Sequence, residues 1–314
     1  MRLVPSQLHG YRIRQYSGEI VMTETIQTVT IDSPEYPVLL KEIHRPPETL
    51  WARGAWLKNG ENCLAVVGTR KPTYYAEAVT PPLVEELAAA GLTIVSGLAL
   101  GVDTMAHRAA LKAGGRTIAV LGSGMDHKSL FPPENRELME SIIAAGGLVI
   151  SEFPEGTPAR KEHFPQRNRI IAGLSVGVLV IEAPTRSGAL ITTRYATEQN
   201  REVFATPGPI NSPYSWGPNW LIQQGAHPVL KAQDVFDVLG VAKPALAVDV
   251  TMTDTSTPEA DADTLESHLS FHPIHIDELI RKTGRPAHVI NTRLAALEIE
   301  GKVRHIGGGR YVRI

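Results

Sequence analysis

The residues best suited to chemistry lie between 163 and 208, where an aromatic, several cations and a glycine loop follow one another. The loop Ser187-Gly188-Ala189 follows the apolar run at residues 178–181 and is expected to open a helix. Backbone N–H groups and the positive end of the helix dipole meet at such a start, which therefore suits an anion. Just upstream, residues 164–169 combine an aromatic ring with two arginines and an asparagine. This combination indicates a nucleotide or nucleic-acid ligand.

Four other segments place small or polar residues where an apolar run of strand length ends. They are Gly68-Thr69-Arg70, Ser96-Gly97, Gly122-Ser123-Gly124 and residues 151–153. In an open parallel sheet such ends meet at one edge, and ligands bind there. A loop between a strand and a helix also needs glycine for its turn, so one such loop alone says little. Several of them close to arginines favour an anionic ligand.

Several familiar sites do not fit the sequence. Gly122 and Gly124 lack the third glycine of a dinucleotide-binding loop, and no Walker A lysine is present. Residues 173–177 match G-x-S-x-G as text, but a helix precedes a strand here, which is the reverse of a nucleophile elbow. The histidines lack metal-ligand spacing, so we expect no metal ion and no other cofactor. Asp103 and His107 are interpreted as a helix-start and packing pair.

The elements that must position these residues form a regular alternation from Cys63 onward. The expected strands are residues 64–67, 92–95, 117–121, 148–151, 178–181, 203–205 and 227–230. The expected helices are residues 74–90, 102–113, 134–145, 166–174, 188–200, 218–224 and 232–239. This alternation predicts an α/β fold, a Rossmann-like doubly wound parallel sheet with helices on both faces. Pro81-Pro82 is predicted to break the first helix in two.

The part of the chain before this alternation is harder to interpret. Residues 1–35 form an N-terminal segment in which residues 12–22 and 26–31 alternate weakly, as the strands of a hairpin do. Residues 36–240 contain the Rossmann-like domain, and residues 36–54 within it are expected to be a connecting segment.

A smaller domain at residues 263–314 follows residues 241–262, which are rich in Ala, Thr, Pro and Asp and are expected to be a flexible acidic linker. Helices are expected at residues 276–282 and 287–300. Three residues at i, i+4 and i+7 give the second helix its buried face: Ile290, Leu294 and Leu297. A hairpin follows at residues 303–314. This order of elements predicts a C-terminal winged-helix domain.

The bulk composition limits the class of protein. The 314 residues carry a formal net charge of −2, so any phosphate binding must come from local arrangement. Residues 153–201 hold seven Lys or Arg and four Asp or Glu, a local charge of +3. No run of about 20 apolar residues is present, so we expect no membrane span. The single cysteine, Cys63, and the lack of a signal-peptide pattern favour a cytoplasmic protein.

Long motifs in this chain follow one another in the order of a known family. They are Val67-Gly68-Thr69-Arg70, Ser96-Gly97-Leu98-Ala99-Leu100-Gly101-Val102-Asp103, Pro132-Pro133-Glu134-Asn135-Arg136, Ser151-Glu152-Phe153-Pro154, residues 164–175 and Ser187-Gly188-Ala189-Leu190-Ile191-Thr192. In them the chain resembles the bacterial DNA-processing protein A family, also called DprA or Smf. The resemblance runs from about residue 36 to residue 240, and the tail fits the family's winged-helix module. Residues 1–30 do not resemble the helical domain that many members carry at this position.

The resemblance implies an extended Rossmann fold, a homodimer and a protein without catalytic activity that binds single-stranded DNA regardless of sequence. It also implies loading of the RecA recombinase onto incoming DNA during natural transformation. In this family's pattern Arg70 would hold a phosphate, the glycine loops would offer N–H groups, and residues 167–169 would flank the groove. Phe153 or Phe164 would stack on a base, although core packing is an equal alternative for Phe164. The expected DNA-binding residues are Thr69, Arg70, Gly122, Ser123, Gly124, Phe153, Phe164, Arg167, Asn168, Arg169, Ser187, Gly188 and Thr192.

Two other functions remain open from the residues alone. An enzyme similar to nucleotide phosphoribohydrolases would need a carboxylate near the glycine loop, and after Ser187-Gly188 none appears until Glu198. A regulator of duplex DNA would act through residues 264–314, whose expected recognition helix carries Arg293 but also two glutamates. Contact with another protein is an equally good use of that module.

Overall fold

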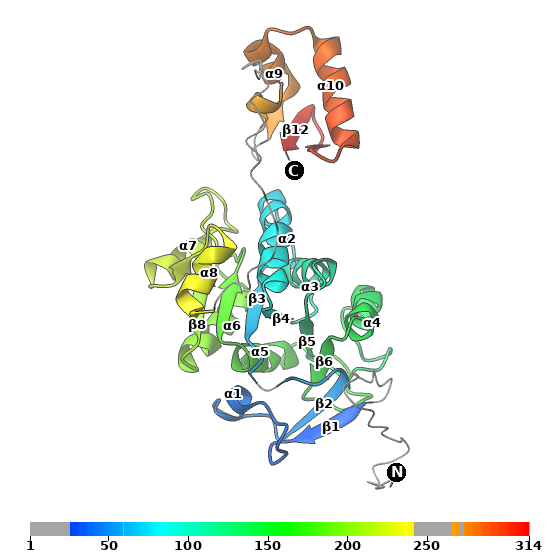
Figure 1. The fold of residues 1–314 in the computed structure, drawn as a ribbon, viewed down its shortest axis with the longest axis vertical. Helices are drawn as coiled ribbons and strands as arrows, with labels where there is room; N and C mark the ends of the chain where they lie inside the picture. The colour runs from blue at the N-terminus through cyan, green and yellow to red at the C-terminus, as the bar shows by residue number, and fades with distance from the viewer. Residues whose placement is uncertain (1–25, 59, 242–264, 270–272, 314) are drawn as a thin grey trace, which may run out of the picture. The chain divides into compact units, whose positions relative to one another are not determined.

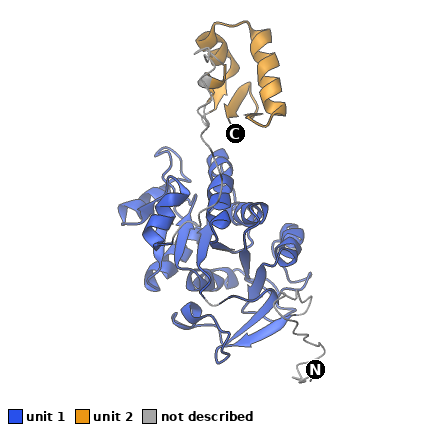
Figure 2. Cartoon of the chain, in the orientation of Figure 1, with its two compact units in different colours: residues 1–246 blue, residues 247–314 orange. Residues whose placement is uncertain are grey.

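The computed structural model describes residues 26–58, 60–241, 265–269 and 273–313. The chain divides into two compact units, residues 1–246 and residues 247–314 (Figure 2). The weakly alternating residues 12–22 and nearly all of the expected linker at 241–262 lie outside the described residues. Among the described residues, no helix combines the length and apolar character that crossing a bilayer requires.

Unit 1 is built on a nine-stranded sheet in the order β1-β2-β6-β5-β4-β3-β7-β8-β9 (Figure 1). Its strands are β1 (Gln27–Thr30), β2 (Thr49–Gly54), β3 (Cys63–Val67), β4 (Thr93–Ser96), β5 (Thr117–Leu121), β6 (Leu148–Ser151), β7 (Gly177–Val180), β8 (Glu202–Ala205) and β9 (His227–Pro228). From β3 the chain runs outward through β4 and β5 to β6, then returns to β7 on the other side of β3. Strands β3 to β9 pair in parallel. The reversal between β3 and β7 is the topological switch point, where sheets of this kind bind ligands.

Helices cover both faces of this sheet. In unit 1 they are α1 (Val38–Lys41), α2 (Tyr74–Ala89), α3 (Val102–Lys112), α4 (Arg136–Ala144), α5 (His163–Leu174), α6 (Gly188–Glu198), α7 (Trp216–Gln223) and α8 (Ala232–Leu239), with a 3₁₀ turn, η1 (Pro133–Asn135). Helices α2, α3 and α8 pack with Leu64 and Val66 of β3, whereas α5, α6 and α7 pack with Ala65 and Val67. Because both faces are buried, the strands are continuous apolar runs. The predicted Rossmann-like doubly wound sheet is confirmed.

Helix α2 is not broken at Pro81-Pro82, so that prediction is wrong. Each proline removes one backbone hydrogen bond, which lowers the stability of the isolated helix. The segment after the prolines buries Leu83, Val84 and Leu87 in the core between α2 and the sheet. Burial of this apolar side stabilises the helix more than the two prolines destabilise it.

The segment at residues 36–54 is more than a connection. Its last six residues form β2, which pairs antiparallel with β1 on one side and with β6 on the other. The partner of the weakly alternating residues 26–31 is therefore β2. Leu50 and Ala52 of β2 are buried while their neighbours are half-buried, which is the alternation of a strand near the edge of a sheet.

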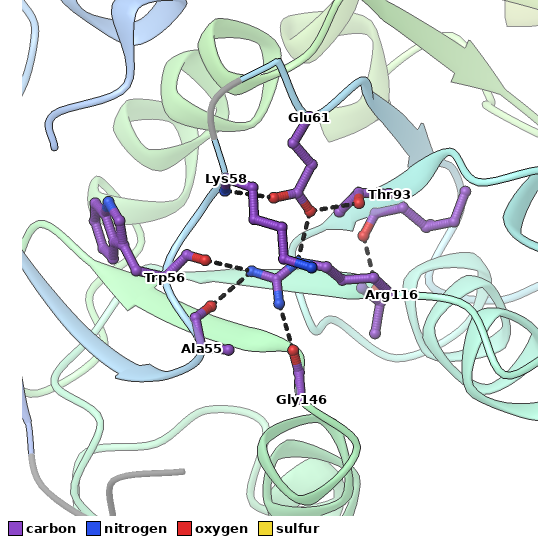
Figure 3. Close-up of polar contacts among 9 residues, drawn as sticks. Ala55, Trp56, Lys58, Glu61, Thr93, Arg116 and Gly146 are labelled. Atoms are coloured by element: carbon purple, nitrogen blue, oxygen red, sulfur yellow. Dashed lines mark hydrogen bonds and ion pairs between the residues drawn. The ribbon is translucent and has the colours of Figure 1, made fainter. Parts of the chain in front are cut away.

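A polar cluster around Arg116 joins the amino ends of the central strands (Figure 3). The guanidinium of Arg116 donates to the carbonyl of Ala55 at 2.6 Å and to the carbonyl of Gly146. Its Nε lies 2.5 Å from Oε1 of Glu61, and the same oxygen accepts from the Thr93 hydroxyl at 2.5 Å. This Arg116 cluster ties the segment after β2 to the beginnings of β4, β5 and β6, at the edge of the sheet opposite the switch-point loops.

Unit 2 has its own small core. It consists of η2 (Leu265–His268), β10 (Ile274–His275), α9 (Ile276–Thr283), α10 (Ala287–Ile299), β11 (Val303–His305) and β12 (Arg310–Arg313). The strands form a sheet in the order β10-β12-β11, and Ile290, Leu294 and Leu297 of α10 are buried as predicted. The predicted winged helix is confirmed. Arg293 of α10 pairs with Glu266 and lies 3.9 Å from Glu300, so its charge is balanced by carboxylates of its own unit.

Candidate functional site

A cavity of about 630 Å³ opens at the carboxyl ends of β3 and β7, which form the switch point of the sheet. Residues 67–70 at the end of β3 form one of its sides, residues 184 and 186–189 after β7 form a second, and α5 forms a third. Helix α6 begins beside the cavity with Ser187 as its N-cap, whose hydroxyl accepts from the N–H of Ala189 at 3.2 Å. The positive end of the α6 dipole therefore lies at the cavity. Predicted residues that line the cavity are Thr69, Arg70, Phe164, Arg167, Asn168, Ser187, Gly188 and Thr192.

Arg167 forms the floor of this cavity and is only 4% exposed. Its Nη1 donates to the carbonyl of Gly97 at 2.6 Å and to the carbonyl of Val120, so it connects the ends of β4 and β5. Its Nε donates to Oδ1 of Asn168 at 3.2 Å, and the Asn168 amide donates to the carbonyl of Gly188 at 3.2 Å. We expected Arg167 to flank the DNA-binding groove. Because these donors already bind protein oxygens, its place in the structure is that of a clamp between loops.

A second buried charge, Asp103, lines the same cavity. Oδ2 of Asp103 accepts from the N–H groups of Gly97 at 3.1 Å and Ala99 at 3.3 Å. Burial raises the pKa of Asp103 despite the opposing charge of Arg167 and these hydrogen bonds, and burial lowers the pKa of Arg167 to about 10. Burial, together with the charge of Arg167, lowers the pKa of His107 to about 3. Asp103 thus binds the loop before α3 at the start of that helix, and His107 is a neutral core residue. This confirms their interpretation as a helix-start and packing pair.

The rim of the cavity carries cations and aromatic rings. Arg70 is exposed, and its guanidinium carbon lies 5.3 Å from the centroid of the Phe164 ring. The ring of Phe131, which is 46% exposed, has its centroid 5.7 Å from that of Phe164. Lys161 and Arg186 are exposed and also line the cavity. Cations bind phosphates and aromatic rings stack on bases, so this rim suits a nucleotide unit.

Sequence reasoning missed two of these rim residues, Phe131 and Lys161. Phe131 stands in a loop about 30 residues before residue 163, and the motif Pro132-Pro133-Glu134-Asn135-Arg136 begins at the residue after it without including it. Lys161 lies between Arg160 and Glu162, a mixture typical of any solvated loop. Its position just ahead of residue 163 is the only signal that could have found it.

The predicted loop Gly122-Ser123-Gly124 is not part of the cavity lining. All three residues are buried, and the N–H of Gly124 donates to the carbonyl of Thr157 at 2.9 Å. A Cβ atom at Gly122 would come within 3.0 Å of the Phe164 ring. The glycine therefore lets Phe164 pack closely against this loop, and DNA contact by these three residues stays a prediction.

Phe153 and Arg169 also lie outside the cavity lining. The ring of Phe153 stacks on His163 with 4.1 Å between centroids and 18° between planes. Arg169 pairs with Glu152, and its side chain is 13% exposed. The geometry thus places Phe164, and not Phe153, in the cavity lining, and Arg169, which was expected to flank the groove, pairs with Glu152 outside that lining.

Comparison with known proteins gives matches along both units. Residues 27–240 match the model of the DNA recombination-mediator protein A family, and residues 251–309 match the DprA winged helix domain. The DNA processing protein DprA of Bacillus subtilis is 46% identical over 216 residues, which cover 68% of this chain and 71% of the relative. Protein Smf of Escherichia coli is 39% identical over 290 residues, which cover 91% of this chain and 77% of the relative.

Two solved structures share the fold and a substantial part of the sequence. The DprA structure from Streptococcus pneumoniae has a TM-score of 0.64 at 42% identity and covers 68% of this chain and 74% of its own. DNA processing protein A from Helicobacter pylori, described with a single-stranded DNA binding mode, has a TM-score of 0.60 at 31% identity and covers 68% of this chain and 95% of its own. The chain therefore belongs to the DNA recombination-mediator protein A family, also called DprA or Smf.

Proposed function

We propose that this protein binds single-stranded DNA at the switch-point cavity, regardless of sequence and without catalysing a reaction on it. One observation carries the proposal: three exposed cations, Arg70, Lys161 and Arg186, line a cavity whose rim holds Phe131 and Phe164. Such cations neutralise phosphates, and aromatic rings stack on any base, so the combination is typical of single-strand binding grooves. The single-stranded DNA binding mode described for the Helicobacter pylori relative supports the same conclusion.

The partners of two carboxylates, Asp103 in the cavity lining and Glu182 after β7, support binding without catalysis. A phosphoribohydrolase-like reaction would need a carboxylate directed at the ligand. Asp103 lines the cavity, but its Oδ2 accepts from two backbone N–H groups of the loop before α3. Glu182, buried just after β7, accepts from the N–H of Thr73 at 3.0 Å and from its hydroxyl at 2.5 Å. Both carboxylates therefore hold loops in place, and the enzymatic alternative gains no support from them.

The binding proposal is tested by removing one rim cation. Arg70→Ala is expected to weaken binding of a labelled oligo-dT about tenfold or more, because a charge-assisted contact to phosphate is lost. The slope of log K against log salt should fall by about 0.7 in magnitude for that phosphate. Fluorescence anisotropy over a salt series measures both quantities.

Arg194→Ala is the matched control, since Arg194 is an arginine of α6 whose side chain is 79% exposed and pairs with Glu198 outside the cavity. An unchanged affinity for Arg70→Ala, or an equal loss in both variants, would contradict a phosphate contact at the cavity.

We further propose that the bound strand serves as the platform on which RecA is loaded during natural transformation. Membership in a family of recombination mediators supports this step. The expected result is faster RecA filament formation on DNA coated with single-strand binding protein when this chain is added. A chain that binds DNA normally but leaves filament formation unchanged would contradict the loading role and leave the binding role intact.

We also propose that the chain forms a homodimer through α7. The rings of Trp216 and Trp220 stack with 5.8 Å between centroids, and they are 43% and 40% exposed. Ile210 nearby is 98% exposed. Exposed aromatic side chains next to aliphatic ones are typical of protein interfaces, because burial on association removes their apolar area from water.

A further inference from the structure

Unit 2, orange in Figure 2, carries a groove with a volume of about 560 Å³. One side of it is formed by η2, through Leu265 and Glu266. The residues that form the other side are spaced three or four apart and so make one stripe along α10. They are Arg285, His288, Val289, Thr292, Arg293 and Ala296. The stripe that packs in the core of unit 2 is a different one, so α10 presents a second side that this core does not cover.

One end of the groove is cationic. Arg285 and His288 are exposed there, and residues 281–293 contain four Lys or Arg and no Asp or Glu. Helix α10 begins at this end with Pro286 as its N-cap and without a side-chain cap, so the positive end of its dipole adds to the charge. A carboxylate is therefore favoured at this end of the groove.

The groove beyond this end is largely apolar. Leu265, Val289 and Ala296 line it, and Val289 is 37% exposed. Its one further cation, Arg293, already pairs with Glu266. From residue 288 to residue 296 the groove follows α10 for about 12 Å, which matches about four residues of an extended peptide. A ligand that fills it therefore carries its acidic group and its apolar side chain a few residues apart.

We propose that this groove binds an acidic segment of a partner protein, with a carboxylate at the Arg285 end and an apolar side chain against Val289. A nucleic-acid backbone fits less well, because it repeats a negative charge at every nucleotide while the groove presents Glu266 and an apolar surface beyond its cationic end. The inference is independent of DNA binding at the switch-point cavity, since every residue that carries it belongs to unit 2.

The test measures binding of a fluorescein-labelled synthetic peptide, Asp-Asp-Ser-Leu-Leu, to the full chain by fluorescence anisotropy. An analogue with Asn in place of both Asp should bind about tenfold more weakly or less, because its charge-assisted contact is lost. An analogue with Ser in place of both Leu should also bind about tenfold more weakly or less, because its apolar side chains are missing.

Arg285→Ala should weaken binding of the acidic peptide about tenfold and leave binding of the Asn analogue within twofold of the wild type. Arg285→Glu should reverse the preference, so that Lys-Lys-Ser-Leu-Leu binds more tightly than the acidic peptide. Arg310→Ala is the matched control, because Arg310 is an exposed arginine of β12 outside the groove lining. It should bind the acidic peptide within twofold of the wild type, and thermal unfolding checks that each variant keeps its fold.

Four results would overturn the inference. They are no measurable binding of the acidic peptide by the wild type, equal affinity for the acidic peptide and its Asn analogue, an equal loss in Arg285→Ala and Arg310→Ala, and a loss in Arg285→Ala that affects duplex DNA and not the peptide. Binding that appears only after the five carboxylates at residues 249–263 are neutralised would instead assign the groove to the chain's own acidic segment. Oligo-dT binding, measured on the same samples, tests the proposed function separately.

Discussion

Two arginines of the same cavity have different roles because they differ in burial. Arg70 is exposed at the rim, where its charge can meet a phosphate, whereas Arg167 is 4% exposed and donates to carbonyls at the ends of β4 and β5. The planar guanidinium is needed at Arg167 because it must reach two carbonyls and Asn168 at fixed angles, which a lysine ammonium cannot do. Arg70 lies in the loop after β3 and Arg167 in α5, and both follow from motifs with the same expected ligand, so only the structure separates their roles.

The neutral state of His107 predicts a dependence of stability on pH. Its native pKa is lowered to about 3 by burial, whereas in the unfolded chain it is near 6.5. Below pH 6.5 the unfolded chain therefore binds a proton that the native protein excludes. Stability contributed by this residue is present above pH 6.5 and falls as the pH drops toward 3, by at most about 1.4 kcal/mol per pH unit.

The measurement is urea unfolding of the wild type and of His107→Asn between pH 7.5 and 4.5. Asparagine can still donate to the Thr117 hydroxyl, which lies 2.7 Å from Nδ1 of His107. The free energy of unfolding of the wild type should fall faster than that of the variant as the pH drops. Because both proteins contain Asp103, its own contribution to the pH dependence cancels in this comparison. Parallel curves of unfolding free energy against pH for the two proteins would show that native His107 binds a proton as readily as unfolded His107 does.

At the scale of elements, periodicity and glycine positions predict the central strands and helices of unit 1 closely. The prediction of β5 at residues 117–121 and of β6 at residues 148–151 matches the structure residue for residue. What the pattern could not supply was β2, because its residues TLWARG place the apolar Trp51 between Leu50 and Ala52, so the residue types do not alternate although their burial does. The unbroken α2 was also missed, since tertiary packing there outweighs the local effect of two prolines.

The Arg116 cluster predicts which contacts hold the antiparallel strands β1 and β2 to the parallel part of the sheet. The side chains of Arg116 and Glu61 are 18% and 9% exposed, so Arg116→Ala would leave a buried carboxylate without its cation. We expect the free energy of unfolding to fall by about 3 kcal/mol, measured by urea titration.

Lys112→Ala is the control for that measurement. Lys112 also pairs with a glutamate, Glu85, but its side chain is 73% exposed, so the loss should be below about 1 kcal/mol. Equal losses of unfolding free energy in the two variants would show that burial does not determine how much these ion pairs contribute to stability.

At the scale of the whole molecule, the α7 surface predicts the oligomeric state. Trp220→Glu would place a charge beside Trp216 in an apolar interface, which favours the monomer because the charge must be desolvated on association. Analytical ultracentrifugation should show a dimer for the wild type and a monomer for the variant. Val38→Glu, at a side chain that is 71% exposed on α1, should leave the mass unchanged. A wild-type monomer, or a dimer that survives the change at Trp220, would contradict the proposed interface.

The amino-acid sequence by itself determined the class of fold, the winged helix and the edge of the sheet at which the cavity opens. These follow from local information: apolar runs, helical spacing, and small residues where strands end. It also placed Arg70, Phe164, Ser187 and Gly188 together, because strand ends in a doubly wound sheet converge at the switch point.

Only the tertiary structure decided which of the candidate side chains reach the cavity. The place of a side chain depends on its partners: backbone carbonyls hold Arg167 in the floor, Arg169 pairs with Glu152 outside the cavity lining, and the carbonyl of Thr157 accepts from the N–H of Gly124. The exposed ring of Phe131 comes from a distant loop. Such partners are brought together by packing of segments far apart in the chain, and the sequence around each residue carries no record of them.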